Sequence, residues 1–195
     1  MRAQATTHAA WAVFGQEIDG AELLRSSHGK SLDEFADQLG GSEGDGNAFV
    51  EAYRDFYYTR NSEGLEVYAG IPQVLAELGA RELKMGVVTA KLGKGARQEL
   101  EIVGLRQWLS VVIGAEDASR SKPHPEPFIK AMAELGAHPE HTLMVGDTPA
   151  DVAGARAAGI RVAAALWGSS DPNALLAAQP DHRLQQPSDM LALIN

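Results

Sequence analysis

The chain has 195 residues, no cysteine, and 17 Lys and Arg against 26 Asp and Glu, for a formal net charge of −9. The lack of cysteine excludes a disulfide framework, a zinc–thiolate site and a cysteine nucleophile. The acidic balance disfavours nucleic-acid and membrane partners, because both need a positive surface, and no apolar run approaches the roughly 20 residues that span a bilayer. We therefore expect a cytoplasmic globular protein.

Residues 1–68 carry helical patterns and no convincing strand. Phe49, Tyr53, Phe56 and Tyr57 recur at spacings of i, i+4, i+7 and i+8, which is typical of the buried face of a helix. The glycine-rich run 40–47 before them predicts a turn. This part of the chain is therefore expected to form a small helical subdomain with a core of its own.

From residue 69 onward, helical segments alternate with short apolar runs. The expected helices are 72–78, 94–103, 126–135, 149–158, 173–178 and a last one from 188, and the expected strands are 85–89, 111–114, 142–146, 161–166 and 182–184. Strands that alternate with helices of about ten residues indicate parallel βαβ units. The predicted fold class is α/β, a three-layer parallel sheet with helices on both faces.

Polar side chains follow the strands of this predicted sheet. Thr89 ends the first strand, Asp147 and Asp151 follow the third, and Lys122 lies in a proline-rich loop between them. In an open parallel sheet, ligands bind at the carboxyl ends of the strands. Carboxylates suit Mg²⁺, whereas a lysine and a hydroxyl complement a phosphoryl group. The pattern predicts metal-assisted phosphoryl transfer, although each residue alone has a structural reading as well.

At these residues the chain resembles the haloacid dehalogenase-like hydrolase superfamily, in particular its phosphoglycolate phosphatase-like branch. The segments VVTAK (87–91), SKPHPEPF (121–128) and VGDTPADVAGARAAGI (145–160) are similar to the second, third and fourth motifs of that superfamily. The resemblance implies a helical cap subdomain over residues 1–68 and a Rossmann-like core over residues 69–195. It favours a phosphatase over a dehalogenase because of the acid pair.

The resemblance also implies roles for individual residues. Thr89 and Ala90 would bind the transferring phosphoryl group, and Lys122 would neutralise the nucleophile and the phosphoryl oxygens. Asp147 would hold Mg²⁺, and Asp151 would support the metal directly or through water. The implied activity is Mg²⁺-dependent hydrolysis of a small phosphorylated metabolite through an aspartyl-phosphate intermediate.

One motif of the superfamily is absent from the sequence. Its members begin with a strand that ends in Asp-x-Asp-Gly-Thr, whereas here only Glu17-Ile18-Asp19-Gly20-Ala21 imitates that pattern. Gly15 and Gln16 would interrupt a strand leading into it, because glycine weakens a strand interior. The missing strand would lie centrally, between the strands that end at Thr89 and Asp147.

Two hypotheses follow from this departure. In the first, roughly 15 to 20 further residues precede Met1, enough for one strand and a motif loop, and the chain without them is an inactive form of a phosphatase. In the second, the two neighbouring strands pair directly and the protein binds phosphate or metal without turnover.

The cap is expected to choose the substrate. Arg25, His28 and Lys30 flank a glycine turn there, and Lys30 is a candidate substrate-binding residue. The alternative interpretation is a solvated loop between helices, since loops are normally polar and exposed.

Overall fold

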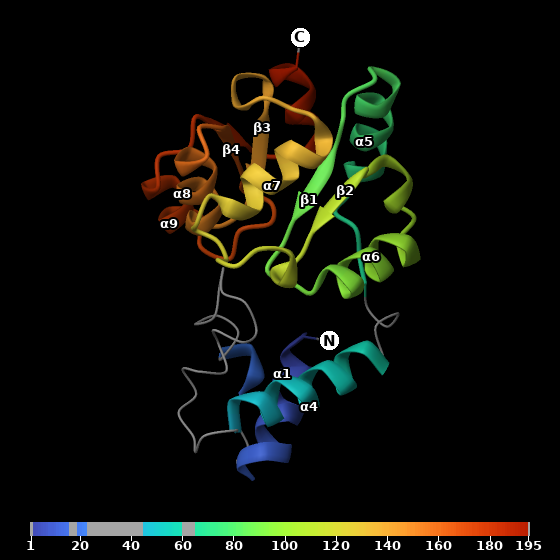
Figure 1. Ribbon diagram of the computed structural model, residues 1–195, viewed down its shortest axis with the longest axis vertical. Coiled ribbons are helices and arrows are strands. Elements are labelled where there is room, and N and C mark those ends of the chain that lie inside the picture. Colours follow the sequence, from blue (N-terminus) through green and yellow to red (C-terminus); the bar gives the residue numbers. More distant parts are fainter. Residues whose placement is uncertain (1, 16–18, 23–44, 60–64, 195) are drawn as a thin grey trace. The chain divides into compact units, whose positions relative to one another are not determined.

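The computed structural model describes residues 2–15, 19–22, 45–59 and 65–194. The chain divides into two compact units, residues 1–65 and residues 66–195 (Figure 1). Within the described ranges, no helix is both long and apolar enough to cross a membrane.

The first unit is built on two helices, α1 (Arg2–Phe14) and α4 (Asp45–Thr59). Ala9 and Ala10 of α1 pack against Phe49, Tyr53 and Tyr57 of α4. All five side chains are buried, and the two tyrosine rings stack with their centroids 5.6 Å apart. The aromatic repeat predicted from the sequence is therefore confirmed as the core of this unit.

The second unit alternates helices, strands and short 3-10 helices (η). In chain order these are α5 (Ile71–Ala80), β1 (Gly86–Val88), α6 (Gly93–Ile102), η1 (Arg106–Trp108), β2 (Val111–Ile113), η2 (Ala115–Asp117), α7 (Glu126–Leu135), η3 (Pro139–His141), β3 (Leu143–Gly146), α8 (Pro149–Ala157), β4 (Arg161–Ala165), α9 (Pro172–Ala177), β5 (His182–Leu184) and η4 (Pro187–Leu193). The α/β class predicted from the sequence is confirmed. The last predicted helix is a 3-10 segment instead of an α-helix.

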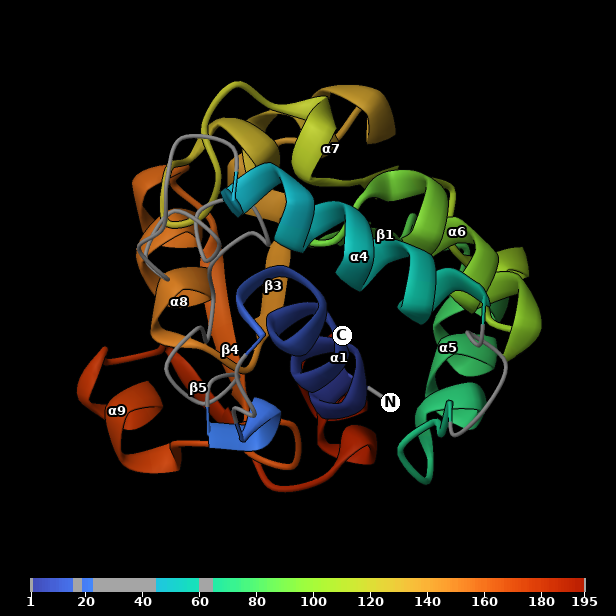
Figure 2. The ribbon, with the colours of Figure 1, turned by 90° about the horizontal axis from the view of Figure 1, so that it is seen from below.

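All strand pairs in this unit are parallel, and they form two sheets, β1-β2 and β3-β4-β5. Side chains of β4 alternate between two cores. Val162 and Ala164 pack with α7, α8 and α9, whereas Ala163 packs with α5 and η4. Figure 2 shows α8 and α9 on the β4–β5 side of the core and α5 and α6 on the β1 side. The three-layer arrangement follows from this alternation, because each face of a pleated strand needs its own cover.

The two sheets are linked by side chains. Among the described residues, β1 pairs with β2 and β3 pairs with β4, and no ladder joins β1 to β3. Helix α7 spans both sheets, since Phe128 packs with β4 while Ala131 packs with β2. The facing strands β1 and β3 are mostly half-buried, whereas β2 is fully buried. The hypothesis of direct pairing between β1 and β3 is thus wrong, and the missing central strand stays a prediction.

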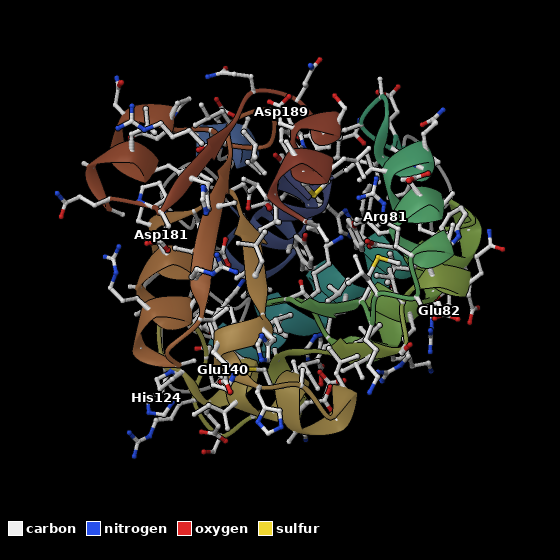
Figure 3. The ribbon with its side chains drawn as sticks, turned by 90° about the horizontal axis from the view of Figure 1, so that it is seen from above. Arg81, Glu82, His124, Glu140, Asp181 and Asp189 are labelled. Atoms are coloured by element: carbon white, nitrogen blue, oxygen red, sulfur yellow. The ribbon has the colours of Figure 1, made fainter. Side chains whose placement is uncertain are left out.

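Two carboxylates, the exposed Asp181 and the half-buried Asp189, accept backbone hydrogen bonds next to β4 and β5. Asp181 accepts a hydrogen bond from the backbone of Val162 at 2.7 Å, and Asp189 accepts bonds from Gln185 at 2.8 Å and Gln186 at 3.2 Å. Figure 3 labels both aspartates. These bonds lower the pKa of Asp189, with the backbone of Gln185 as the largest cause. They satisfy backbone donors near the start of β4 and just after the end of β5.

Candidate active site

The turn between β3 and α8 is fixed by its own side chains. Thr148 is the N-cap of α8, and its hydroxyl accepts a hydrogen bond from the backbone of Asp151 at 3.2 Å. In return, Asp151 Oδ2 accepts from the Thr148 backbone at 3.1 Å and from the Thr148 hydroxyl at 2.8 Å. This reciprocal arrangement is a capping box, and Pro149 occupies the first helical turn.

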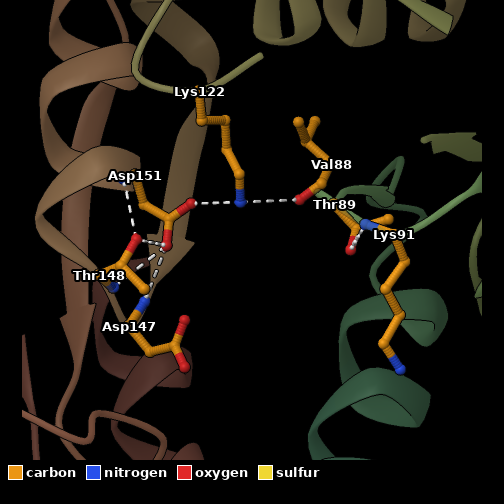
Figure 4. A network of polar contacts seen from close by, with 7 residues as sticks. All are labelled: Val88, Thr89, Lys91, Lys122, Asp147, Thr148 and Asp151. Carbon is orange, nitrogen blue, oxygen red and sulfur yellow. Dashed lines mark hydrogen bonds and ion pairs between the residues drawn. The ribbon is translucent and has the colours of Figure 1, made fainter. Parts of the chain in front are cut away.

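Lys122 reaches this turn from the loop before α7. Its Nζ lies 2.7 Å from Asp151 Oδ1 and donates to the Val88 carbonyl at 3.5 Å (Figure 4). The side chain of Lys122 is 12% exposed and that of Asp151 is 3% exposed. The ammonium thus connects the end of β1 to the start of α8. The structure brings together two residues that lie 29 positions apart in the sequence.

Thr89 follows β1 and opens the turn into α6. Its backbone donates to the Ile113 carbonyl at 2.9 Å, and its hydroxyl accepts from the Lys91 backbone at 3.1 Å. The Lys91 side chain forms an ion pair with Glu99 of α6. Thr89 and Ala90 line a small pocket together with Ser121, Lys122 and the residues Gly114, Ala115, Ala118 and Pro127. Thr89 and Lys122 therefore line one pocket.

The turn after Thr89 depends on Glu116, which sequence reasoning missed. The side chain of Leu92, the N-cap of α6, makes no capping bond. Both carboxylate oxygens of Glu116 instead lie 2.9 Å from the backbone nitrogen of Gly93. A carboxylate at this position favours the helix, because the helix N-terminus carries partial positive charge. Glu116 lies 23 residues away in sequence, so no local capping pattern could have indicated it.

The loop that carries Lys122 is held by a third carboxylate, Glu126. It accepts from the backbone of Ser119 at 2.7 Å and from the Ser119 hydroxyl at 2.8 Å, while its own backbone donates to His124 Nδ1 at 3.2 Å. The pKa of Glu126 is lowered, first by the Ser119 backbone bond and then by the Ser119 hydroxyl. The structure places His124 in this loop network, where its Nε2 lies 3.0 Å from Arg120.

Asp147 lies at the carboxyl end of β3 and is half-buried. A Cβ added at Gly168 would lie 3.2 Å from Asp147 Oδ2, so the turn after β4 passes close to this carboxylate. The described residues contain no group of three or more His, Cys, Asp or Glu side chains that could hold a metal by themselves. Mg²⁺ commonly binds through one or two carboxylates and otherwise keeps water or phosphate oxygens, so Asp147 fits the chemistry of such an ion.

Two further sequence predictions concern the first unit. Lys30, with Arg25 and His28, lies outside the described residues. Asp19 belongs to the segment that imitates the absent motif, and its Oδ1 accepts from the backbones of Ala21 at 2.8 Å and Glu22 at 3.4 Å. This is the bonding of a helix cap.

Comparison with known proteins assigns the family. The family model described as haloacid dehalogenase-like hydrolase matches residues 3–165. The pyrophosphatase PpaX of Oceanobacillus iheyensis is 32% identical over 145 residues, which cover 74% of this chain and 68% of that protein.

Solved structures share the fold. A Lactobacillus plantarum protein named as a phosphoglycolate phosphatase superposes with a TM-score of 0.85 at 25% identity, covering 98% of this chain and 90% of its own. A Haemophilus somnus protein with the same designation gives a TM-score of 0.86 at 23% identity, covering 99% of this chain and 90% of its own. This chain belongs to the haloacid dehalogenase-like hydrolase family and is a hydrolase of the same type as these phosphatases.

Proposed function

We propose that this protein, in its complete form, is a Mg²⁺-dependent phosphatase that hydrolyses a small, phosphoglycolate-like phosphate monoester. One observation carries the proposal. Thr89 and Lys122 line one pocket, and the Lys122 ammonium bonds to Asp151 at the end of the neighbouring sheet. The names of the pyrophosphatase and phosphoglycolate phosphatase relatives support a small phosphorylated substrate. The cytoplasmic location expected from the sequence stays a prediction.

Each residue at the site has a role in this proposal. The Lys122 ammonium offsets the charge of phosphoryl oxygens in a partly buried site, where such an interaction is stronger than in water. The Thr89 hydroxyl and the Ala90 backbone bind the same oxygens from the opposite turn. Asp147 and Asp151 form the metal side of the site, with Asp147 as the direct ligand. Bound Mg²⁺ would neutralise phosphate charge and orient the substrate.

The family chemistry also needs an aspartate nucleophile that forms an aspartyl-phosphate. The sequence contains no Asp-x-Asp-Gly-Thr segment. We assign no nucleophilic role to Thr89, because its described side-chain contact is with the Lys91 backbone nitrogen and includes no general base to activate the hydroxyl. We therefore expect no phosphatase turnover from the 195-residue chain. This absence also favours the second candidate, a protein that binds phosphate or metal without turnover.

A two-part assay tests the proposal. The 195-residue chain and a version extended by its natural upstream coding sequence are incubated with Mg²⁺ and a panel of phosphate esters that includes phosphoglycolate and pyrophosphate. We expect phosphate release from the extended chain alone, and loss of that release on Lys122→Ala. The matched control is Lys84→Ala, which removes an exposed lysine that bonds to the Leu135 carbonyl.

The outcomes separate the candidates. Turnover by the 195-residue chain itself would contradict the expected role of the absent motif. An extended chain that binds inorganic phosphate but releases none from any ester would favour the binding protein. Equal activity of the Lys122→Ala and Lys84→Ala variants would contradict the proposed role of Lys122 in phosphate release.

A further inference from the structure

Asp151 has a surrounding unlike that of any other carboxylate in the part of the chain that the structure describes. It is the one charged residue there that is fully buried, with 2% of its surface exposed. A buried carboxylate is costly unless hydrogen bonds and an opposite charge compensate it. The contacts of Asp151 therefore identify the groups that compensate its buried charge.

Four hydrogen bonds converge on this carboxylate. Oδ2 accepts from the backbone nitrogens of Asp147 at 3.2 Å and Thr148 at 3.1 Å, and from the Thr148 hydroxyl at 2.8 Å. Oδ1 lies 2.7 Å from Lys122 Nζ. An ionised carboxylate offers about four acceptor positions. Three donors crowd Oδ2, and the donor on Oδ1 is a cation, which would repel a divalent ion bound to the same oxygen.

The backbone is shaped to admit Asp151 at this place. A Cβ added at Gly146 would lie 2.4 Å from Asp151 Cβ and 2.9 Å from its Oδ2. No real side chain tolerates such distances, so only glycine at the end of β3 lets the carboxylate lie against the strand. Gly146 and the Thr148 cap together set the position of Asp151.

The position of Asp151 in turn sets that of the Lys122 ammonium. Lys122 has four rotatable side-chain bonds and lies in a loop, yet its Nζ contacts both Asp151 Oδ1 and the Val88 carbonyl (Figure 4). The Val88 contact is at 3.5 Å and the Asp151 contact at 2.7 Å, so the carboxylate is the stronger partner.

We propose that Asp151 is a positioning residue, which holds the Lys122 ammonium and the backbone of the β3–α8 turn, and that Asp147 alone of the pair ligates metal. The inference rests on the proposed function, in which the Lys122 ammonium binds phosphate. It adds a defined role for Asp151. It gives separate roles to two aspartates that the family resemblance assigned to the same metal site. Asp151 acts on phosphate through Lys122, and Asp147 acts through the ion.

The first test needs no activity. Nuclear magnetic resonance of ¹⁵N-lysine-labelled protein detects ammonium protons that are held in hydrogen bonds. We expect a protected Lys122 Nζ signal in the natural chain and in Asp147→Asn, and its loss in Asp151→Asn. Gly146→Ala should also lose the signal, because it displaces Asp151 without changing any charge, so it serves if Asp151→Asn does not fold. The signal is assigned by its absence in Lys122→Met. Persistence of the signal in a folded Asp151→Asn or Gly146→Ala variant would overturn the proposal.

The second test is a thermodynamic cycle measured by calorimetry with MgCl₂ and inorganic phosphate as the probes. We expect Asp147→Asn to weaken Mg²⁺ binding and Asp151→Asn to leave it unchanged. Asp151→Asn should weaken phosphate binding about ten- to a hundredfold when Lys122 is present, the usual range for a charged hydrogen bond. In the Lys122→Met background, Asp151→Asn should leave the affinity for phosphate unchanged.

The two hypotheses fail separately. Equal loss of Mg²⁺ binding in both aspartate variants, independent of Lys122, would make Asp151 a metal ligand and overturn the inference. A chain that binds neither probe would contradict the proposed function, while the lysine signal would still decide whether Asp151 positions Lys122.

Discussion

Two strand-to-helix turns carry the candidate site, and they are stabilised in opposite ways. The β3–α8 turn is closed from within, because Thr148 and Asp151 cap each other across three residues. The β1–α6 turn takes its cap from Glu116 of η2. A local capping box leaves a recognisable pattern in the sequence, whereas a distant cap leaves none. The difference explains why the sequence pattern can indicate the cap of the first turn but not that of the second.

The largest expected effect concerns the internally closed turn. Asp151→Ala removes the partner of Lys122, whose side chain is 12% exposed, and leaves an uncompensated ammonium. Breaking a buried pair in this way costs about 3–5 kcal/mol of unfolding free energy. Urea denaturation measures this loss of unfolding free energy.

The matched control is Asp171→Ala. Asp171 also caps a helix, accepting from the Ala174 backbone at 2.9 Å, but it is exposed and pairs with no lysine among its described contacts. We expect Asp171→Ala to lower the unfolding free energy by about 1 kcal/mol. Equal losses in the two variants would mean that the Lys122–Asp151 pair adds nothing beyond an ordinary cap.

The next effect concerns the turn that takes its cap from outside. Gly114→Ala would place a Cβ 2.1 Å from the Gly93 nitrogen and 2.5 Å from its Cα, so one of the two backbones must move. We expect a loss of about 1–3 kcal/mol, the usual cost of overpacking. Gly79→Ala is the control, since its nearest neighbour is a Trp108 side-chain atom at 3.3 Å and alanine suits a helix. A Gly114→Ala variant as stable as this control would show that the two loops are not in tight contact.

The sequence predicted most of what is local in this molecule. Alternating helices and strands fixed the fold class, and the aromatic repeat of α4 located the core of the first unit. The strand ends located Thr89 and Asp147. The features that could not be predicted depend on contacts between residues that no local pattern links. Examples are the hydrogen bond from the Gly93 nitrogen to Glu116 and the close approach of Asp151 to Gly146. The division of the strands into two sheets is likewise a property of pairing, which no single strand encodes.

A smaller pair of effects compares the two caps directly. Thr148→Ala and Glu116→Ala should each cost about 0.5–2 kcal/mol, the range for loss of a helix cap. Amide hydrogen exchange distinguishes them. Glu116→Ala should speed exchange at Gly93, which loses its acceptor, and leave the α8 amides unchanged. Thr148→Ala should do the reverse, with faster exchange at Asp151. If Glu116→Ala also exposes the α8 amides, the two turns are one cooperative unit.

The smallest effect separates hydrogen bonding from burial as the source of carboxylate stabilisation. The side chain of Glu126 is 34% exposed, and hydrogen bonds from Ser119 lower its pKa below the ordinary value of 4.5. Because the folded pKa is the lower one, the ionised form stabilises the fold above about pH 4.5, and this contribution is lost as the pH falls through the folded pKa. Glu126→Gln should therefore lower stability at neutral pH, where the ionised form contributes, and flatten the stability profile in that acidic window.

The Ser119→Ala variant sharpens this last prediction. The backbone of Ser119 is the largest cause of the shift and the hydroxyl the second. The variant keeps the backbone donor, so a carboxyl titration followed by nuclear magnetic resonance should find the pKa of Glu126 partly restored and still below 4.5. A full return to 4.5 would assign the shift to the hydroxyl alone. A value of 4.5 already in the natural chain would mean that the Ser119 bonds do not hold in solution, and that the Lys122 loop owes its position to Asp151 at its other end.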